Sequence, residues 1–131
     1  MPIPLRPHRQ TKQQKQKNPL NYLPRSGGDF FAFMKEQLLL AWDIHNQKNL
    51  LLIFHLTETA LNLSLSSRGR TVAEQLAHMH NIRLNWMENV AKPLYQKSLL
   101  LSKEVTLTPA VLTESFKASS TVLRQIIETS W

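Results

Sequence analysis

The sequence predicts an all-α protein. Apolar residues recur at three- and four-residue spacing in three separate stretches, and each stretch begins with residues typical of helix caps. No pair of alternating strands joined by a hairpin turn is present. At 131 residues the chain is long enough for one domain with a modest core, so we expect a single helical bundle.

The first helix is predicted to begin after a Ser-Gly-Gly turn. Asp29 offers a side-chain oxygen for capping the first helical N–H groups, and the helical pattern starts at Phe30. A second apolar stretch, residues 50–56, either continues this helix or follows a kink near residues 46–49. The apolar stripe of the first part is formed by Phe30, Phe33, Met34, Leu38, Ala41, Ile44 and His45.

The second helix has the clearest start. Residues 57–69 are predicted to be a connection, because they are rich in serine and contain a glycine. Thr71 and Glu74 then fit a capping box, in which the Thr hydroxyl and the Glu carboxylate satisfy each other's backbone N–H groups. The helix should run to about Ala91, since Pro93 disfavours helical geometry at the residue before it.

The third helix is predicted to begin at Thr108-Pro109, an N-cap followed by proline at the first helical position, and to reach the chain end. Residues 94–107 before it are mixed, with the three leucines 99–101 packing beneath a loop. The apolar residues of the third helix are Val111, Leu112, Phe116, Val122, Leu123, Ile126 and Ile127.

Charge is distributed unevenly along the chain. The formal net charge is +7, and residues 1–25 carry six Lys and Arg residues and no acidic residue, so the remaining chain is near +1. We therefore expect residues 1–28 to be a disordered basic tail and residues 29–131 to be the helical domain. Nucleic-acid binding is expected only non-specifically, through phosphate contacts of residues 1–25.

Several classes of protein are excluded by composition. There is no cysteine, so disulfides, a thiolate nucleophile and Cys-ligated zinc are impossible, and any metal must take nitrogen or oxygen ligands. The longest apolar run, residues 50–54, is far shorter than the roughly 18 residues of a membrane span, and no signal-peptide pattern is evident. We expect a cytoplasmic protein that does not enter membranes.

Two of the five histidines are candidate metal ligands. His78 and His80 lie about 200° apart on a helix, so only one of them can bind a given metal ion. Periodicity favours His80 as the inward-facing residue, for which a hydrogen-bonded core position is the simpler interpretation. His8 and His55 are expected to have solvent or packing roles.

Residues 69–88, with a Thr-Val start followed by a Leu-Ala-His turn, resemble the second helix of DinB-like proteins, and residues 41–49 are similar to the end of that family's first helix. The resemblance covers roughly residues 30–131. It implies an up-down four-helix bundle of which this chain lacks the fourth helix. It also implies that the histidine of the Leu-Ala-His turn, His78, binds a divalent metal such as nickel, zinc or iron, with His80 as the alternative.

The resemblance further implies a metal-dependent transferase that uses a low-molecular-weight thiol, to which Arg83 or His80 could contribute substrate contacts. The family's other two ligands come from an H-x-x-x-H pair on the fourth helix, and this sequence contains no such pair. We therefore expect the chain as given to bind metal weakly and to be inactive. The alternative is a non-catalytic helical interaction module that forms a homodimer, because three helices do not cover the seams formed by Leu38, Ala41, Leu76, Met79, Phe116 and Leu123.

Overall fold

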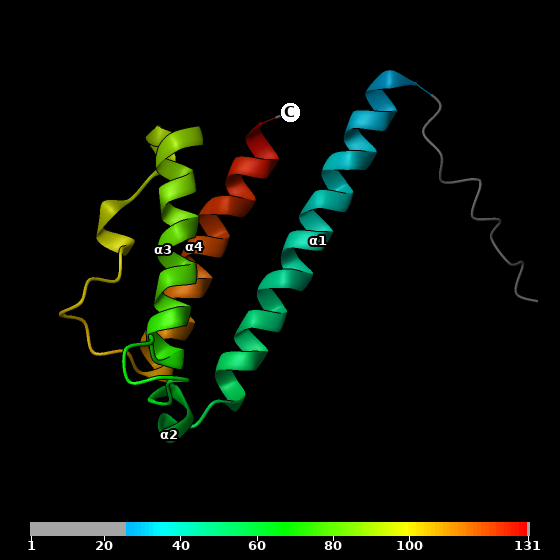
Figure 1. Cartoon of the computed structure of the whole chain (residues 1–131). Coiled ribbons are helices and arrows are strands. Elements are labelled where there is room, and N and C mark those ends of the chain that lie inside the picture. The colour runs from blue at the N-terminus through cyan, green and yellow to red at the C-terminus, as the bar shows by residue number, and fades with distance from the viewer. Residues whose placement is uncertain (1–25, 131) are drawn as a thin grey trace, which may run out of the picture.

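The structure, a computed structural model, describes residues 26–130 and is built on three long helices (Figure 1). Within these residues no β-strand is present, apart from an isolated bridge between Ser64 and Thr71. The all-α fold class is confirmed. The elements are α1 (Gly27–His55), α2 (Glu58–Leu61), α3 (Val72–Val90), the 3-10 turns η2 (Lys92–Leu94) and η3 (Lys97–Leu99), and α4 (Pro109–Thr129).

Helix α1 begins at Gly27, so the last two residues of the tail predicted for residues 1–28 are helical. The side chain of Ser26 is the N-cap, and its Oγ accepts a hydrogen bond from the backbone N–H of Asp29 at 3.1 Å. The prediction that Asp29 caps this helix was therefore wrong. Asp29 instead lies in the first turn, where its negative charge interacts favourably with the helix dipole. Residues 1–25 of the predicted tail lie outside the described residues.

The caps of α3 and α4 were predicted correctly. The backbone N–H of Thr71 donates to Oε2 of Glu74 at 2.9 Å, and the N–H of Glu74 donates to the Thr71 hydroxyl at 3.2 Å, which completes the capping box. Thr108 caps α4 through its hydroxyl, which accepts from the N–H of Val111 at 3.2 Å, and Pro109 is at the first helical position. Helix α1 runs without interruption to His55, so the apolar residues 50–55 continue it and there is no break near residues 46–49.

Helices α3 and α4 run in the same direction, and α1 runs opposite to both (Figure 1). Leu76 near the start of α3 packs in one cluster with Leu112 near the start of α4, and Leu84 further along α3 packs with Val122. The up-down order expected for successive helices therefore does not hold between α3 and α4. Residues 91–108 cross back along the bundle and allow α4 to start at the same end as α3.

The buried core has two adjoining clusters. The three leucines 99–101 pack against these clusters from the crossover, as expected from the sequence. Within residues 26–130, no helix has the length and apolarity that crossing a membrane requires. The buried apolar residues are Ile53, Leu61, Ala73, Leu76, Ala77, Leu112 and Phe116 in one cluster and Leu84, Met87 and Val122 in the other.

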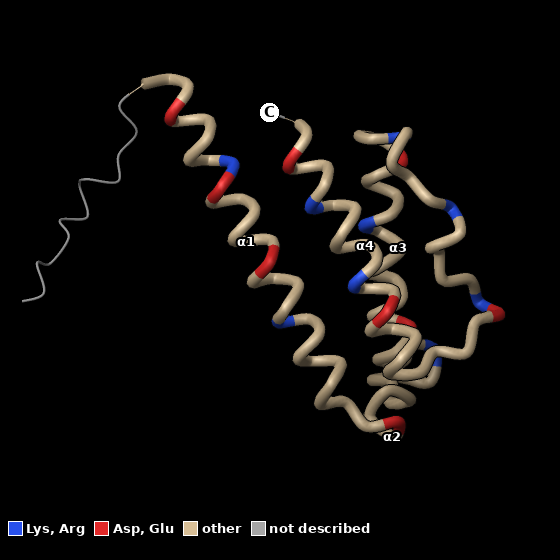
Figure 2. Tube along the Cα trace, turned by 180° about the vertical axis from the view of Figure 1, so that it is seen from behind, with Lys and Arg blue, Asp and Glu red and all other residues tan. Residues whose placement is uncertain are grey.

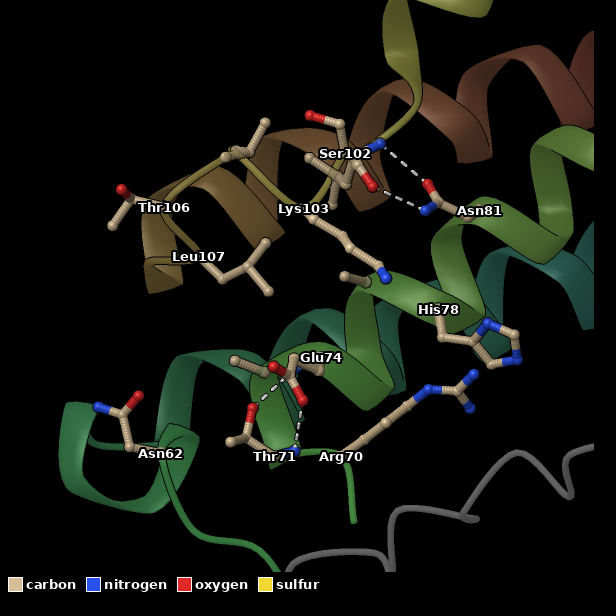
Figure 3. A pocket seen from close by; sticks show the side chains of 14 residues that line it. Asn62, Arg70, Thr71, Glu74, His78, Asn81, Ser102, Lys103, Thr106 and Leu107 are labelled. Carbon is tan, nitrogen blue, oxygen red and sulfur yellow. Dashed lines mark hydrogen bonds between the residues drawn. The ribbon is translucent and has the colours of Figure 1, made fainter. Parts of the chain in front are cut away.

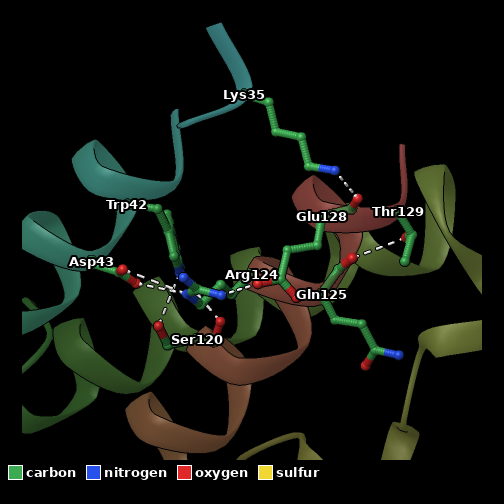
Figure 4. Close-up of polar contacts among 8 residues, drawn as sticks. All are labelled: Lys35, Trp42, Asp43, Ser120, Arg124, Gln125, Glu128 and Thr129. Carbon is green, nitrogen blue, oxygen red and sulfur yellow. Dashed lines mark hydrogen bonds and ion pairs between the residues drawn. The ribbon is translucent and has the colours of Figure 1, made fainter. Parts of the chain in front are cut away.

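Polar contacts join α1 to α4 along their antiparallel seam (Figure 4). The indole N–H of Trp42 lies 2.9 Å from the hydroxyl of Ser120, and Arg124 pairs with Asp43 at 3.2 Å. Further along, Lys35 donates to the main-chain carbonyl of Glu128. These contacts fix the register of α1 on α4 and place Trp42 against the core.

Candidate functional site

His78 lies in a pocket between α3 and the crossover segment 101–107 (Figure 3). Its side chain is partly buried and forms no hydrogen bond with another described residue. One wall of the pocket is a stripe of α3 at three- and four-residue spacing, formed by Thr71, Glu74, His78 and Asn81. The capping box therefore sets where this wall begins and which side chains face the pocket.

Asn81 holds the opposite wall in place. Its Nδ2 donates to the carbonyl of Leu101 at 2.8 Å, and the N–H of Leu101 donates back to its Oδ1 at 2.9 Å. The side-chain amide of Asn81 thus satisfies both backbone polar groups of Leu101, which have no partner in regular secondary structure. The irregular crossover segment is thereby fixed against α3. The pocket next to His78 consequently has a defined shape.

His80, two residues further along α3, is fully buried on the opposite side of the helix. Its Nε2 lies 2.7 Å from the carbonyl oxygen of Leu99, and its Nδ1 lies 3.1 Å from Oγ of Ser119. Because a carbonyl can only accept, we assign the proton to Nε2, and Nδ1 then accepts from the Ser119 hydroxyl. Both nitrogens of His80 are thus occupied by protein partners.

The pKa of His80 is lowered from its ordinary value of 6.5. Burial is the largest cause; the bond to the Leu99 carbonyl acts in the opposite direction, and the nearby positive charge of Arg83 lowers it further. His80 is accordingly a neutral core residue near pH 7. Periodicity had placed it on the inward face, and the structure agrees.

Arg83 lies in the core where α1, α3 and α4 meet, and only 9% of it is exposed. Its guanidinium carbon is 4.9 Å from the ring centroid of Trp42 and 4.5 Å from that of Phe116, and its Nη1 donates to Ser119 at 3.3 Å and to Asn46 at 3.5 Å. Burial lowers its pKa to about 10. Among residues 26–130 it has no carboxylate partner.

His45 is an exposed residue at the edge of this cluster. Its Nε2 lies 3.1 Å from Nδ2 of Asn49 and 3.5 Å from Nη2 of Arg83. Partial burial, and then the charge of Arg83, lower its pKa. His45 therefore marks the place where α1 and α3 approach each other at the surface.

Residues 28–129 match the model of the DinB family. The chain belongs to the DinB family. The matched region includes all of α3 and α4 and nearly all of α1, and it confirms the resemblance inferred from residues 69–88. Neither a search of curated proteins nor a search of solved structures gives a match.

The donor atoms of residues 26–130 do not form a tight metal site. Within the described part of the chain, no three His, Cys, Asp or Glu side chains lie close enough together to hold a metal ion. The one carboxylate in the pocket with His78 belongs to Glu74 and is used in the capping box. A tight site for a transition metal needs at least three such ligands.

Two features of the site were not expected from the sequence. Arg83 was expected to contact substrate, but it is stacked in the core. Its position three residues after His80 puts it on the same buried face of the helix, and this spacing could have indicated its burial. The pocket also contains Arg70 and Lys103, which no pattern in the sequence indicated as site residues. Their proximity depends on how the crossover folds back, and no local pattern encodes it.

Proposed function

We propose that this DinB-family chain is a helical interaction module that associates with a second copy of itself through one face of α1 and α3. The observation that carries the proposal is that large apolar side chains on both helices are left uncovered by the described residues. An amphipathic helix normally buries its apolar stripe, and α1 has apolar residues around most of its circumference.

The apolar side chains of the two helices flank one seam. Leu38 and Leu52 share a stripe of α1 with His45, at seven-residue spacing, and are 41% and 50% exposed. Ile82 and Trp86, one turn apart on α3, are 42% and 64% exposed. Because His45 contacts Arg83 across the seam, these four residues lie along its two sides; we call them the α1–α3 face.

This face has few charges that would keep it in water. After Asp43, Lys48 is the single Lys, Arg, Asp or Glu residue of α1. The half of α1 nearer to α2 accordingly has little blue or red in Figure 2. Burying a fully exposed leucine or isoleucine side chain is worth about 1.5–3 kcal/mol. Because these four residues are 41–64% exposed, covering them is worth roughly half as much for each and offsets part of the entropy lost on association. A second copy is the simplest occupant, since a two-fold contact pairs the same face with itself.

Sedimentation velocity over a concentration series tests the proposal. We expect a dimer for the natural chain and a monomer for Trp86→Glu and Leu52→Glu, because an unpaired charge in a buried interface is strongly unfavourable. Leu65→Glu is the matched control, since Leu65 is fully exposed in the loop before α3 and lies outside the face. A monomer at all concentrations, or a dimer that tolerates both variants, would contradict self-association through this face.

A second candidate function is metal binding at His78, with the chemistry of a thiol-dependent transferase. It is supported by the free imidazole of His78, which contrasts with the occupied nitrogens of His80. We propose that nickel, zinc or iron binds this position weakly, because a single imidazole with water ligands does not hold such a metal tightly. Thiol transfer would require two further ligands beyond those of the described residues.

Isothermal titration with Ni²⁺ tests this second candidate. Weak heats that disappear in His78→Ala and persist in His80→Gln are expected. Tight stoichiometric binding unaffected by His78→Ala would refute it.

Non-specific nucleic-acid binding by residues 1–25 and a cytoplasmic location remain predictions. Nucleic-acid binding through phosphate contacts is tested by whether any affinity falls steeply with salt.

A further inference from the structure

Two cationic side chains from different segments line the pocket that contains His78. Arg70 directly precedes the N-cap of α3, and Lys103 lies in the crossover segment. Figure 3 shows the Arg70 side chain extending toward the His78 ring and the Lys103 side chain reaching across the pocket toward α3. Neither forms an ion pair with any residue between 26 and 130.

The cationic side chains of the pocket outnumber its carboxylates by two to one. Glu74 is the one acidic residue in its lining, and its Oε2 accepts the backbone N–H of Thr71 at 2.9 Å. Glu104, adjacent to Lys103 in sequence, is not part of the lining and is hydrogen-bonded to Ser102 instead. The pocket therefore has an excess of positive charge.

The segments that carry the two cations are tied to the helical body. The backbone of Val72, next to the N-cap, donates to the carbonyl of Leu63 at 2.9 Å, which anchors the loop that leads to Arg70. The paired bonds between Asn81 and Leu101 anchor the start of the segment that carries Lys103. Binding a ligand here would thus require little ordering of the backbone, which favours affinity.

We propose that this pocket binds a small molecule through a carboxylate or phosphate group, with Arg70 and Lys103 as the anion-binding residues. Arg70 can donate two parallel N–H bonds to such a group, and Lys103 adds a mobile point charge from the opposite wall. The hollow has a volume of about 780 Å³, which suits a metabolite-sized molecule. No residue of α1 lines it, so the proposal is independent of self-association.

An NMR titration of the full chain with inorganic phosphate, and separately with succinate, tests the proposal at constant chloride concentration. Saturable shifts are expected at the backbone amides of Arg70 and Lys103. In Arg70→Gln and in Lys103→Gln the dissociation constant should rise at least about tenfold, as expected for loss of a charge-assisted contact to the anion. Lys48→Gln, on α1 and outside the pocket, is the matched control and should bind as the natural chain does.

The two ligands distinguish the source of the anionic group. Saturation by phosphate alone would support a phosphorylated ligand, and saturation by succinate alone would support a carboxylic acid. Absence of saturable shifts with both ligands, or equal affinity in the two pocket variants and the natural chain, would overturn the proposal. Both substituted residues are exposed, so the variants are expected to fold.

Discussion

The guanidinium group of Arg83 stacks on the indole of Trp42, with 4.9 Å between its central carbon and the ring centroid. This contact joins α3 to α1 inside the core, and the ring of Phe116 on α4 lies 4.5 Å away. A single cation therefore connects all three long helices without help from a described carboxylate. The planar, weakly hydrated guanidinium suits such a place better than an ammonium would.

Replacing Arg83 should distinguish stacking from charge. We expect Arg83→Lys to lower the free energy of unfolding by about 2 kcal/mol. The lysine ammonium is more strongly hydrated than the guanidinium, so its burial costs more, and it cannot stack on the two rings. Arg83→Met should cost less, since it removes the buried charge and keeps apolar volume between the two rings. Urea unfolding checks this order, and a lysine variant as stable as the natural protein would contradict it.

His78 and His80 should differ sharply in their effect on stability. We expect His80→Ala to cost about 2–4 kcal/mol, because it opens a cavity and leaves the Leu99 carbonyl without its donor. His78→Ala removes a ring that makes no hydrogen bond in the described chain and should change stability by at most about 0.5 kcal/mol. Thermal unfolding of the two variants provides the comparison. Equal losses would mean that the environments assigned to the two rings are incorrect.

Stability should fall on mild acidification. The folded-state pKa of His80 is lowered from 6.5 by burial, so the unfolded chain takes up a proton more readily than the folded one. The full stability is therefore present above pH 6.5 and is lost progressively as the pH falls from 6.5 toward the folded-state pKa. His45, also lowered, acts in the same direction.

Urea unfolding of the natural chain and of His80→Gln at pH 7.5, 6.5 and 5.5 measures this effect above the range in which most carboxylates titrate. The natural chain should lose stability across the series, and His80→Gln should lose less. An increase in stability toward pH 5.5, or an identical decline in both proteins, would count against a neutral buried His80.

The seam between α1 and α4 offers a comparison of a hydrogen-bonded aromatic side chain with a partly exposed ion pair. Trp42→Phe removes the N–H that bonds to Ser120 and part of the stack on Arg83, and we expect a loss of about 1–2 kcal/mol. Arg124→Gln removes two partly exposed ion pairs, with Asp43 and with Glu128, and should cost less than about 1 kcal/mol. Chemical denaturation tests the ranking. The idea fails if the arginine variant is the less stable of the two.

Local patterns in the sequence were sufficient for the helices and for two of their caps. The residues that decide those features, such as Thr71 with Glu74 and Thr108 with Pro109, are neighbours in the chain. At the start of α1 the same reasoning chose the wrong cap, because serine and aspartate are about equally good N-caps and only the backbone geometry separates Ser26 from Asp29.

Features that depend on the path of the crossover could not be predicted. The parallel course of α3 and α4 follows from residues 91–108, in which only short 3-10 turns form and no periodic pattern reveals direction. The pairing of Arg70 with Lys103 in one pocket has the same origin. By contrast, the inward position of His80 follows from helical periodicity alone, and the structure adds the identity of its two partners.

Self-association through the α1–α3 face is tested most directly by measuring distances between copies of the chain. Because the natural sequence has no cysteine, Asn85→Cys next to Trp86 allows a single spin label on this face. Pulsed electron resonance should detect a short, defined distance between labels of two copies, and this signal should vanish when Trp86→Glu is added. Absence of any intermolecular coupling at concentrations well above those of the sedimentation series would contradict self-association.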